Sequence, residues 1–546
     1  MKMLSAVRYR DHRQTLRVFL LCFLTAALYG LASPDIHWHA LCWIALVPLL
    51  LALEEADSRA GFFIGWLCGT MIHLICFPWI VGTVQRYSDL SSMLSILAWI
   101  FFSLYSGLAF GGMALAYLLL TRRRGLPSLL VLPVSYTAME FLFPFIFPWH
   151  LGAGLYGVVP LIQISDIFGV FGVTALLVAV NAALFEVLRF FLKRRPYPLA
   201  SSLLALLFVA AALAYGYART DSIRERQEEG RPIAVGIVQA DVHIEDKQSA
   251  GYEQKFWRRY RALSQEAVRQ GAEFVVWPES AVPFRYDPRG GPRSASGLLS
   301  RMVESFGTPV LFGSWSIGAE GPRNSAYLLN GKGALQGRYD KVRLLAFGEY
   351  MPFSDWIPQL KNLVGGVGDF RPGERLGPLC WDARCFGPLI CYEAILGNLS
   401  RVMVNSGAKF LVNITNDVWF GDTNCPEQHL MLASFRAVEN RVWMVRAANT
   451  GISAFVDPTG RILNRTDLFS QAVRVSSIEL LDIPTLYKSW GDWFPTACSL
   501  LVAFFLLVSL REEIQRRLAQ RGRAGASAAR PDSADAGPRR SLGRSC

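Results

Sequence analysis

Residues 199–239, LASSLLALLFVAAALAYGYARTDSIRERQEEGRPIAVGIVQ, change character twice within one stretch. The apolar run over residues 199–218 is long enough to cross a bilayer, whose hydrocarbon core takes about 20 helical residues. A charged segment follows, and Ile233–Gln239 then has the short, β-branched and apolar composition of a buried strand. The chain is therefore predicted to leave a membrane here and to begin an α/β domain.

Further apolar stretches of this length occur before residue 199 and after residue 490. Of its 546 residues 52% are hydrophobic and 18% charged, and the mean hydropathy is +0.28, which excludes an ordinary soluble enzyme and a disordered chain. We predict a membrane bundle over residues 16–220 and an eighth transmembrane helix after residue 490. A cleaved signal peptide is the alternative for the first span. The predicted spans are 16–33, 36–53, 61–82, 93–120, 126–147, 164–192, 199–218 and 491–510.

Basic residues indicate the orientation, because Lys and Arg are retained on the cytoplasmic side of a membrane. They gather in residues 1–15, 122–124, 193–195 and 511–546, whereas the intervening loops carry almost none. Both termini are therefore predicted to be cytoplasmic, with residues 511–546 as a basic, disordered tail. The net charge of +12 suits an anionic lipid surface, and we expect no nucleic-acid partner.

The segment 230–485 has the pattern of a single α/β domain on the outer face of the membrane. Short apolar strands, among them Ile233–Gln239, Glu273–Trp277 and Cys385–Cys391, alternate with helices such as Tyr252–Gln270. Strands that are apolar on both faces predict a layered sandwich. About 250 residues are enough to form one core.

Three reactive side chains stand at predicted strand ends, where functional groups of α/β sheets gather. Glu279 lies in WPES, Lys341 in RYDKVRLLAFGEYMPF, and Cys391 closes FGPLIC. A thiol needs a base to take its proton and a cation to favour the thiolate. Glu279 is a candidate base, and Lys341 can stabilise an oxyanion together with the backbone N–H of Tyr392.

These strings resemble the three catalytic blocks of the nitrilase (carbon–nitrogen hydrolase) superfamily. A nitrilase-like domain inserted between a seventh and an eighth span is similar to the apolipoprotein N-acyltransferase family, and the strings FPWHLGAGLYG (147–157) and NITNDVWFGD (413–422) extend the likeness. The resemblance implies an αββα sandwich, about eight transmembrane helices and a place in the bacterial inner membrane, with a periplasmic catalytic domain.

The resemblance also implies a ping-pong acyl transfer. Cys391 would take an acyl chain from a phospholipid of the phosphatidylethanolamine type, and the resulting thioester would pass it to the α-amine of a diacylglyceryl-modified N-terminal cysteine of a lipoprotein. Glu279 would act as base and Lys341 would stabilise the oxyanion. The scheme involves no metal and no organic cofactor.

Further residues are expected to support this chemistry. The acidic positions Glu349 and Glu393 match the family and are expected to orient Lys341 or to bind the loop backbone. Tyr392, Trp419 and Phe420 are candidate walls for an acyl chain, or plain core aromatics. The chain departs from the family where Gln248 follows Lys247, since members commonly have a Trp there.

Some alternatives stay open at this point. A membrane-tethered amidase or nitrilase would use the same three residues on a small carbon–nitrogen substrate, although seven preceding spans argue against mere tethering. A silent scaffold would have lost a catalytic residue, and all three are present. Cys380 and Cys385 flank a predicted hairpin and could pair in an oxidising compartment. The oligomeric state is left open.

Overall fold

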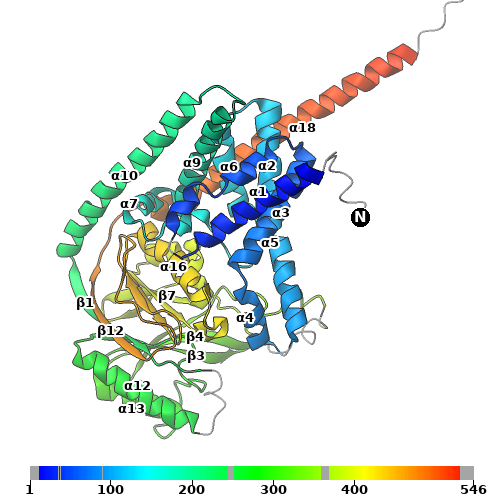
Figure 1. Ribbon diagram of the computed structural model, residues 1–546. Coiled ribbons are helices and arrows are strands. Elements are labelled where there is room, and N and C mark those ends of the chain that lie inside the picture. The colour runs from blue at the N-terminus through cyan, green and yellow to red at the C-terminus, as the bar shows by residue number, and fades with distance from the viewer. Residues whose placement is uncertain are drawn as a thin grey trace, which may run out of the picture.

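The computed structural model describes residues 12–528 except 35, 37, 89, 244–250, 358 and 360–367. A helical bundle and an α/β domain pack directly against each other (Figure 1). The helices of the bundle and its loops are α1 (His12–Leu31), η2 (His39–Trp43), α2 (Val47–Leu53), α3 (Ser58–Cys76), α4 (Trp79–Tyr87), α5 (Ser92–Arg124), α6 (Ser128–Leu142), η3 (Leu151–Leu155), α7 (Val159–Ile162), α8 (Ser165–Phe168), α9 (Val170–Phe191), α10 (Leu199–Glu228) and α18 (Trp493–Ala528).

Each predicted span corresponds to helical structure, but not all of these helices are long. Within the described residues six helices, α1, α3, α5, α9, α10 and α18, have the length and apolar composition to cross a membrane. The predicted spans 36–53 and 126–147 correspond to the shorter apolar helical segments His39–Leu53 and Ser128–Leu142. The chain is thus a membrane protein, while the number of eight spans stays a prediction.

The helices depart from the predicted spans at several places, among them the end of α6 at Leu142 and of α10 at Glu228. The third span ends at Cys76 rather than 82, because Pro78 caps a new helix, α4. Gly169, with φ of +67°, separates α8 from α9 inside the sixth predicted span. The predicted tail begins inside α18, which continues to Ala528, and residues 529–546 lie outside the described part.

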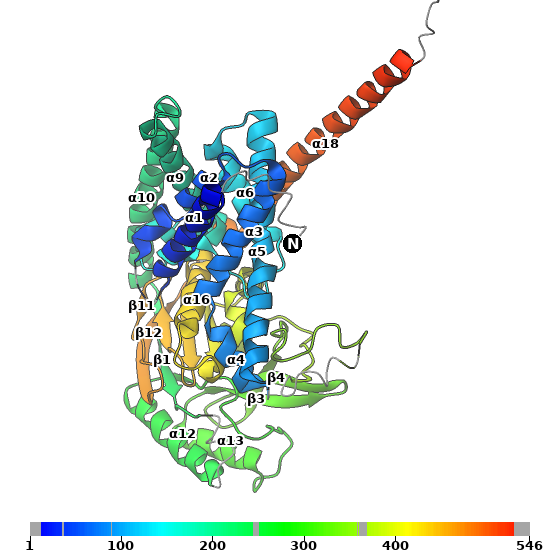
Figure 2. The same cartoon turned by 45° about the vertical axis from the view of Figure 1, so that its right-hand side comes forward.

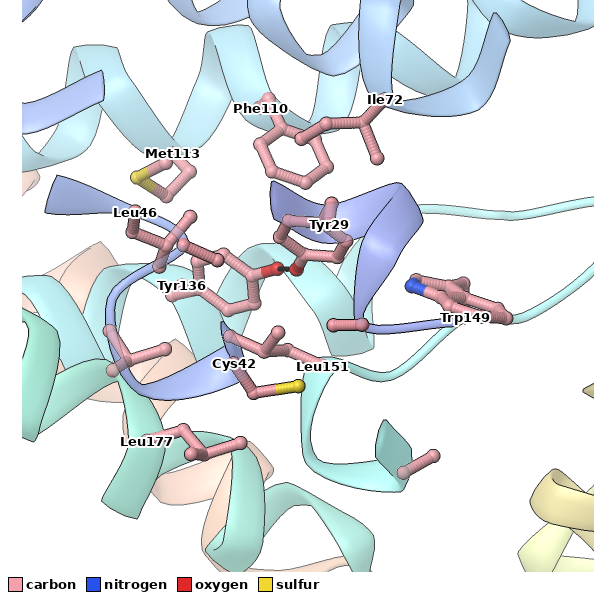
Figure 3. Close-up of a cluster of buried hydrophobic side chains, with 14 of the residues drawn as sticks. Tyr29, Cys42, Leu46, Ile72, Phe110, Met113, Tyr136, Trp149, Leu151 and Leu177 are labelled. Carbon is pink, nitrogen blue, oxygen red and sulfur yellow. Dashed lines mark hydrogen bonds between the residues drawn. The ribbon is translucent and has the colours of Figure 1, made fainter. Parts of the chain in front are cut away.

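Close helix packing holds the bundle together. A side chain at Gly107 of α5 would collide with Thr70 of α3, and one at Gly65 of α3 would collide with the backbone at Phe110 of α5. Small residues of this kind let helix backbones approach each other in a membrane, where van der Waals contact drives association. Figure 3 shows the neighbouring core, where the hydroxyls of Tyr29 and Tyr136 share a hydrogen bond above the buried thiol of Cys42.

The α/β domain is a sandwich of two six-stranded sheets, as predicted. The first sheet has the order β12 (Ala472–Leu480), β1 (Arg231–Gln239), β2 (Phe274–Val276), β3 (Val310–Gly318), β4 (Gly321–Leu329) and β5 (Leu335–Asp340). The second has the order β11 (Ile462–Leu463), β10 (Ala454–Val456), β9 (Met444–Ala448), β8 (Phe410–Thr415), β7 (Arg384–Ile390) and β6 (Leu379–Trp381). The central strands β1–β2–β3 and β7–β8–β9 are parallel.

Helices cover both outer faces of the sandwich, which gives the αββα order. Helices α12 (Tyr252–Arg269) and α13 (Ala295–Phe306) cover the first sheet, and α15 (Gly397–Asn405) and α16 (Cys425–Asn440) cover the second. All residues of α16 are buried, because one side packs on the sheet through Leu430 and Ala433 and the other packs on the bundle through Phe435. The domain is therefore built onto the bundle and not merely tethered to it.

The short hairpin between β6 and β7 has the predicted form. Cys380 and Cys385 are paired across it, and the structure joins them by a disulfide. This answers the question that the spacing alone left open.

Candidate active site

The three candidate catalytic residues come together from the two sheets at the carboxyl ends of their strands. Glu279 follows β2 after Trp277 and Pro278, and Lys341 follows β5 directly. Cys391 follows β7 and begins the short helix η4 (Cys391–Ile395). All three are at least nine-tenths buried, and the charges of Glu279 and Lys341 act on the Cys391 thiol. The predicted trio is thus one cluster.

Lys341 lies between two carboxylates. Its Nζ is 2.8 Å from Glu349 Oε2 and 3.7 Å from Glu279 Oε1. Burial by itself lowers the pKa of Lys341, but the two carboxylates outweigh burial and bring the pKa above its usual value. The ammonium is therefore charged and fixed in place, as an oxyanion partner must be. Glu349 thus contacts Lys341, and it also accepts a hydrogen bond from the backbone N–H of Leu345 at 2.8 Å.

Two amides hold the carboxylate of Glu279. Asn324 Nδ2 donates to Oε1 at 2.7 Å, and the backbone N–H of Asn416 donates to Oε2 at 2.9 Å. Burial raises the pKa of Glu279, and the charge of Lys341 offsets part of this effect. A carboxylate with a raised pKa both takes and returns a proton more readily near neutral pH, which general acid–base catalysis requires.

Cys391 occupies a sharp turn between strand and helix. Its φ of +52° is rare for a residue with a side chain, and backbone strain of this kind gathers at functional sites. Its carbonyl oxygen is held by Asn413 Nδ2 at 3.4 Å and lies 3.2 Å from His429 Nε2. Burial and the charge of Glu279 raise the pKa of the thiol to about 12. The resting thiol is therefore protonated and depends on a base.

Glu393 shapes the loops on both sides of the site. Its Oε1 accepts hydrogen bonds from the hydroxyl of Tyr339 at 2.9 Å and from the backbone N–H groups of Val342 at 2.8 Å and Arg343 at 3.0 Å. Its Oε2 accepts one from the N–H of Ile390 at 2.9 Å. One buried carboxylate thus joins the chain beside Lys341 to the chain before Cys391, the second of the two roles expected for it.

We expect Glu393→Ala to destabilise the folded protein by about 3 kcal/mol, because it leaves several buried donors without an acceptor. Thermal unfolding of the purified protein in detergent measures the loss. Glu304→Ala, at an exposed position of α13, is the control and should unfold close to the wild type. An unchanged unfolding temperature for Glu393→Ala would show that the four hydrogen bonds do not hold the site together.

An apolar cavity of about 280 Å³ opens onto Cys391. Its walls come from both halves of the chain and include Trp79, Ile80, Thr83, Val84, Tyr87, Ala98, Phe101, Phe102, Ile146, Phe147, Phe347, Tyr392, Phe420 and His429. Two of the three predicted wall residues, Tyr392 and Phe420, line this cavity. Trp419 does not; it stacks on the wall residue Tyr87 with ring centres 4.1 Å apart. We call this space the acyl cavity.

Sequence reasoning missed two parts of the site. The first is the amide pair Asn324 and Asn416, for which a polar residue at a strand end was the only available signal. The second is α4, of which the hydropathy pattern assigned only residues 79–82 to a membrane span. Its Trp79 donates to Gln428 of α16 at 3.1 Å, and Figure 2 shows α4 beside the catalytic domain. The departure at Gln248 lies outside the described residues.

Two family models match the chain. The model described as carbon-nitrogen hydrolase covers residues 234–486, and the one described as apolipoprotein N-acyltransferase N-terminal domain covers residues 25–183. Together they span the α/β domain and most of the bundle.

Proteins named apolipoprotein N-acyltransferase are similar over most of the chain. The protein of Geobacter metallireducens is 36% identical over 88% of this chain and 93% of its own length, and that of Chlorobaculum tepidum is 29% identical over 90% and 96%. Among solved structures, the amidase from Nesterenkonia sp. AN1 is 21% identical and covers 47% of this chain and 96% of its own, with a TM-score of 0.35.

Proposed function

Since this chain belongs to the apolipoprotein N-acyltransferase family, we propose that Cys391 takes an acyl chain from a phospholipid and passes it to the α-amine of a diacylglyceryl-modified N-terminal cysteine of a lipoprotein. The observation that carries this proposal is the acyl cavity, which places the Cys391 thiol in an apolar space walled by bundle and catalytic domain together. An acyl chain is stabilised by contact with the apolar side chains of this cavity, whereas a small polar amide would gain little from them.

The first half of the reaction forms a thioester. Glu279 takes the proton of the Cys391 thiol, and the sulfur attacks the ester carbonyl of the lipid. Lys341 and the backbone N–H of Tyr392 stabilise the oxyanion. When the carbon–oxygen bond breaks, Glu279 returns the proton to the departing lysophospholipid oxygen. The acyl group is then bonded to sulfur.

The second half consumes the thioester. Glu279 takes a proton from the neutral amine of the acceptor as its nitrogen attacks the thioester carbonyl, and it gives that proton to the Cys391 sulfur when the carbon–sulfur bond breaks. Water competes with the amine for the same carbonyl. The apolar walls around Cys391 lower the local water concentration and so favour transfer over hydrolysis.

We further propose a multi-pass placement in the inner membrane, with both ends of the chain cytoplasmic and the catalytic domain periplasmic. Within the described residues, the basic positions at the end of α5, after α9 and in α18 support this orientation because they lie at one end of the bundle. Arg124 pairs with Glu512 of α18 at 2.9 Å, and Arg189 of α9 pairs with Glu54, just after α2, at 3.0 Å. Figure 1 shows this end opposite the sheets. Positive charge gathered at one end marks the cytoplasmic side.

The two halves can be tested separately by intact-protein mass spectrometry. Purified protein given phosphatidylethanolamine alone should gain the mass of one acyl chain, which hydroxylamine removes. A diacylated lipopeptide with a free N-terminal amine should then take up that chain. Release of free fatty acid with no lipopeptide product, or turnover of small amides instead, would favour the tethered amidase.

The acyl cavity should also set the preferred chain length. In Ala98→Trp a large ring enters the cavity, so transfer of a 16-carbon chain should fall about tenfold relative to an 8-carbon chain, because the longer chain no longer fits. Competition between the two donors, followed by mass spectrometry of the lipopeptide, measures the ratio. Met93→Trp is the matched control, since Met93 lies on the same helix, is exposed and does not line the cavity. An unchanged ratio in Ala98→Trp would place the chain elsewhere.

A further inference from the structure

A second cavity, of about 250 Å³, lies between the bundle and the catalytic domain. The loop after α6 and the start of α9 form its bundle side, and α16 and the chain around α17 (Leu486–Trp490) form the opposite side. Tyr392 lines both this cavity and the acyl cavity, so the two spaces meet at one side chain. The acyl transfer steps described above make no use of the second cavity.

The lining of the second cavity is charged. Three carboxylates, Glu140, Glu439 and Asp492, share it with Arg436 and His150. Glu439 accepts a hydrogen bond from Arg436 at 2.7 Å, and His150 Nδ1 lies 3.3 Å from Glu140 Oε2. The carboxylates still outnumber the cations. A space of this kind favours a ligand that carries a positive charge.

Four buried polar atoms of residues that line this cavity have no hydrogen-bond partner within the described chain, and two of them belong to α16. Within the described chain, Glu439 Oε2 and Arg436 Nε have no hydrogen-bond partner, although Glu439 is 1% exposed and Arg436 3%. A buried polar atom without a partner is unfavourable, because it has lost its hydrogen bonds to water. One of these atoms accepts and the other donates, so a ligand that has both an N–H donor and an anionic oxygen would satisfy both.

The position of the cavity relative to Cys391 narrows the choice of ligand. With the ester carbonyl at Cys391 and the acyl chain in the acyl cavity, the polar part of the donor lipid must extend elsewhere. The second cavity begins at the next residue, Tyr392, whose hydroxyl donates to the carbonyl oxygen of Ile146 at 3.2 Å. The reacting amine of the acceptor, by contrast, must reach the thioester itself.

We propose that the second cavity binds the phosphoethanolamine headgroup of the acyl donor, with Glu439 and Asp492 facing the ammonium and Arg436 facing a phosphodiester oxygen. This assignment rests on the proposed function and adds to it the residues that select the donor. Burial, with the nearby charge of Asp492, raises the pKa of Glu439 to about 7. A bound ammonium favours the ionised form of this carboxylate and compensates for its burial.

Donor selection is the property to measure. Intact-protein mass spectrometry follows acylation of Cys391 in single turnovers, with phosphatidylethanolamine or phosphatidylglycerol of identical acyl chains in mixed micelles. We expect the wild type to prefer phosphatidylethanolamine at least tenfold. Glu439→Gln should reduce this preference to about twofold, because it slows acylation from phosphatidylethanolamine, whose ammonium loses its carboxylate partner. Acylation from phosphatidylglycerol should keep its rate, because its headgroup has no ammonium.

Two further variants complete the test. Glu439 also accepts a hydrogen bond from the N–H of Val170 at 3.2 Å, so a change at Glu439 can disturb the packing of α9. Asp492→Asn is therefore a second variant, which removes the charge and keeps an oxygen for the Tyr487 hydroxyl. Its preference for phosphatidylethanolamine should also fall. Asp482→Asn removes an exposed carboxylate outside the cavity and should keep the wild-type ratio. Equal slowing of both donors in the cavity variants, or no preference in the wild type, overturns the headgroup site. No acylation of Cys391 from either lipid would instead overturn the proposed function.

Discussion

Cys391→Ala is expected to abolish thioester formation and to lower acyl transfer to the lipopeptide by at least about 10⁴-fold, because no other group of the site can carry the acyl chain. The variant keeps the Cβ at the same strained backbone position, φ +52°, so the turn stays as it is. Its thermal unfolding should therefore match that of the wild type. Intact-protein mass spectrometry after incubation with phosphatidylethanolamine should show no added chain.

The matched control for this loss is Cys425→Ala. Cys425 is a free, fully buried cysteine at the start of α16. Burial raises its pKa, with smaller contributions from Asp417 and Cys391, so it lies near the site without lining the acyl cavity. Removing its sulfur should leave transfer within about threefold of the wild type. Acyl transfer that persists in Cys391→Ala would show that the acyl chain reaches the acceptor without a thioester at this residue.

Local sequence was enough to predict the architecture because its signals are strong. Long apolar runs can only be satisfied in a membrane or a core, and strands such as Ile233–Gln239 were found to within two residues of β1. The strands β9 and β10 were missed because they are short and buried throughout, and β5, β11 and β12 were missed as well. A uniformly buried stretch has no alternation from which a strand can be recognised.

The helix α4 shows where local signals fail. Residues 77–82 read FPWIVG, and their hydropathy continues that of α3, so they were assigned to one span. The outcome depends on a partner far along the chain, because Trp79 packs against Phe420 and donates to Gln428. The prediction that Trp419 lines the acyl cavity was wrong for a similar reason. Trp419 and Phe420 are adjacent aromatics, and only the contacts with α4 determine that Phe420 faces the cavity while Trp419 stacks on Tyr87.

The site was predictable in its reacting atoms and less so in its supports. Glu279 and Cys391 each follow a strand that the sequence predicts. Together with Lys341 they supply a base, a thiol and a cation, and the surrounding strings make this combination specific. Glu349 is eight residues beyond Lys341, and its Oε2 lies 2.8 Å from Nζ of Lys341; the spacing alone does not reveal this contact, which was one of two roles that the resemblance to the family suggested. Asn324 reaches both Glu279 and Glu349, and only the assembled sheet brings these three together.

Glu279→Gln is expected to lower both acylation of Cys391 and transfer to the amine by about 10³-fold, because each half of the reaction moves a proton through this carboxylate. The thiol, with its pKa raised to about 12, has no other base in this scheme. Glu349→Gln is the matched comparison, since it also removes a carboxylate from Lys341 but leaves the proton carrier in place. We expect it to cost about tenfold.

The pH dependence of acylation distinguishes the role of Glu279 as a proton carrier from the effect of a negative charge beside Lys341. Burial raises the pKa of Glu279 above its ordinary value, and the residue acts as a base only when ionised. Acylation by the wild type should therefore be constant above this pKa and fall tenfold per pH unit below it. Glu279→Gln has no carboxylate to protonate, so its residual rate should lack this acid limb, whereas Glu349→Gln should keep it. Equal losses in the two variants, with the acid limb retained in both, would mean that Glu279 acts on Lys341 through its charge alone and that another group carries the proton.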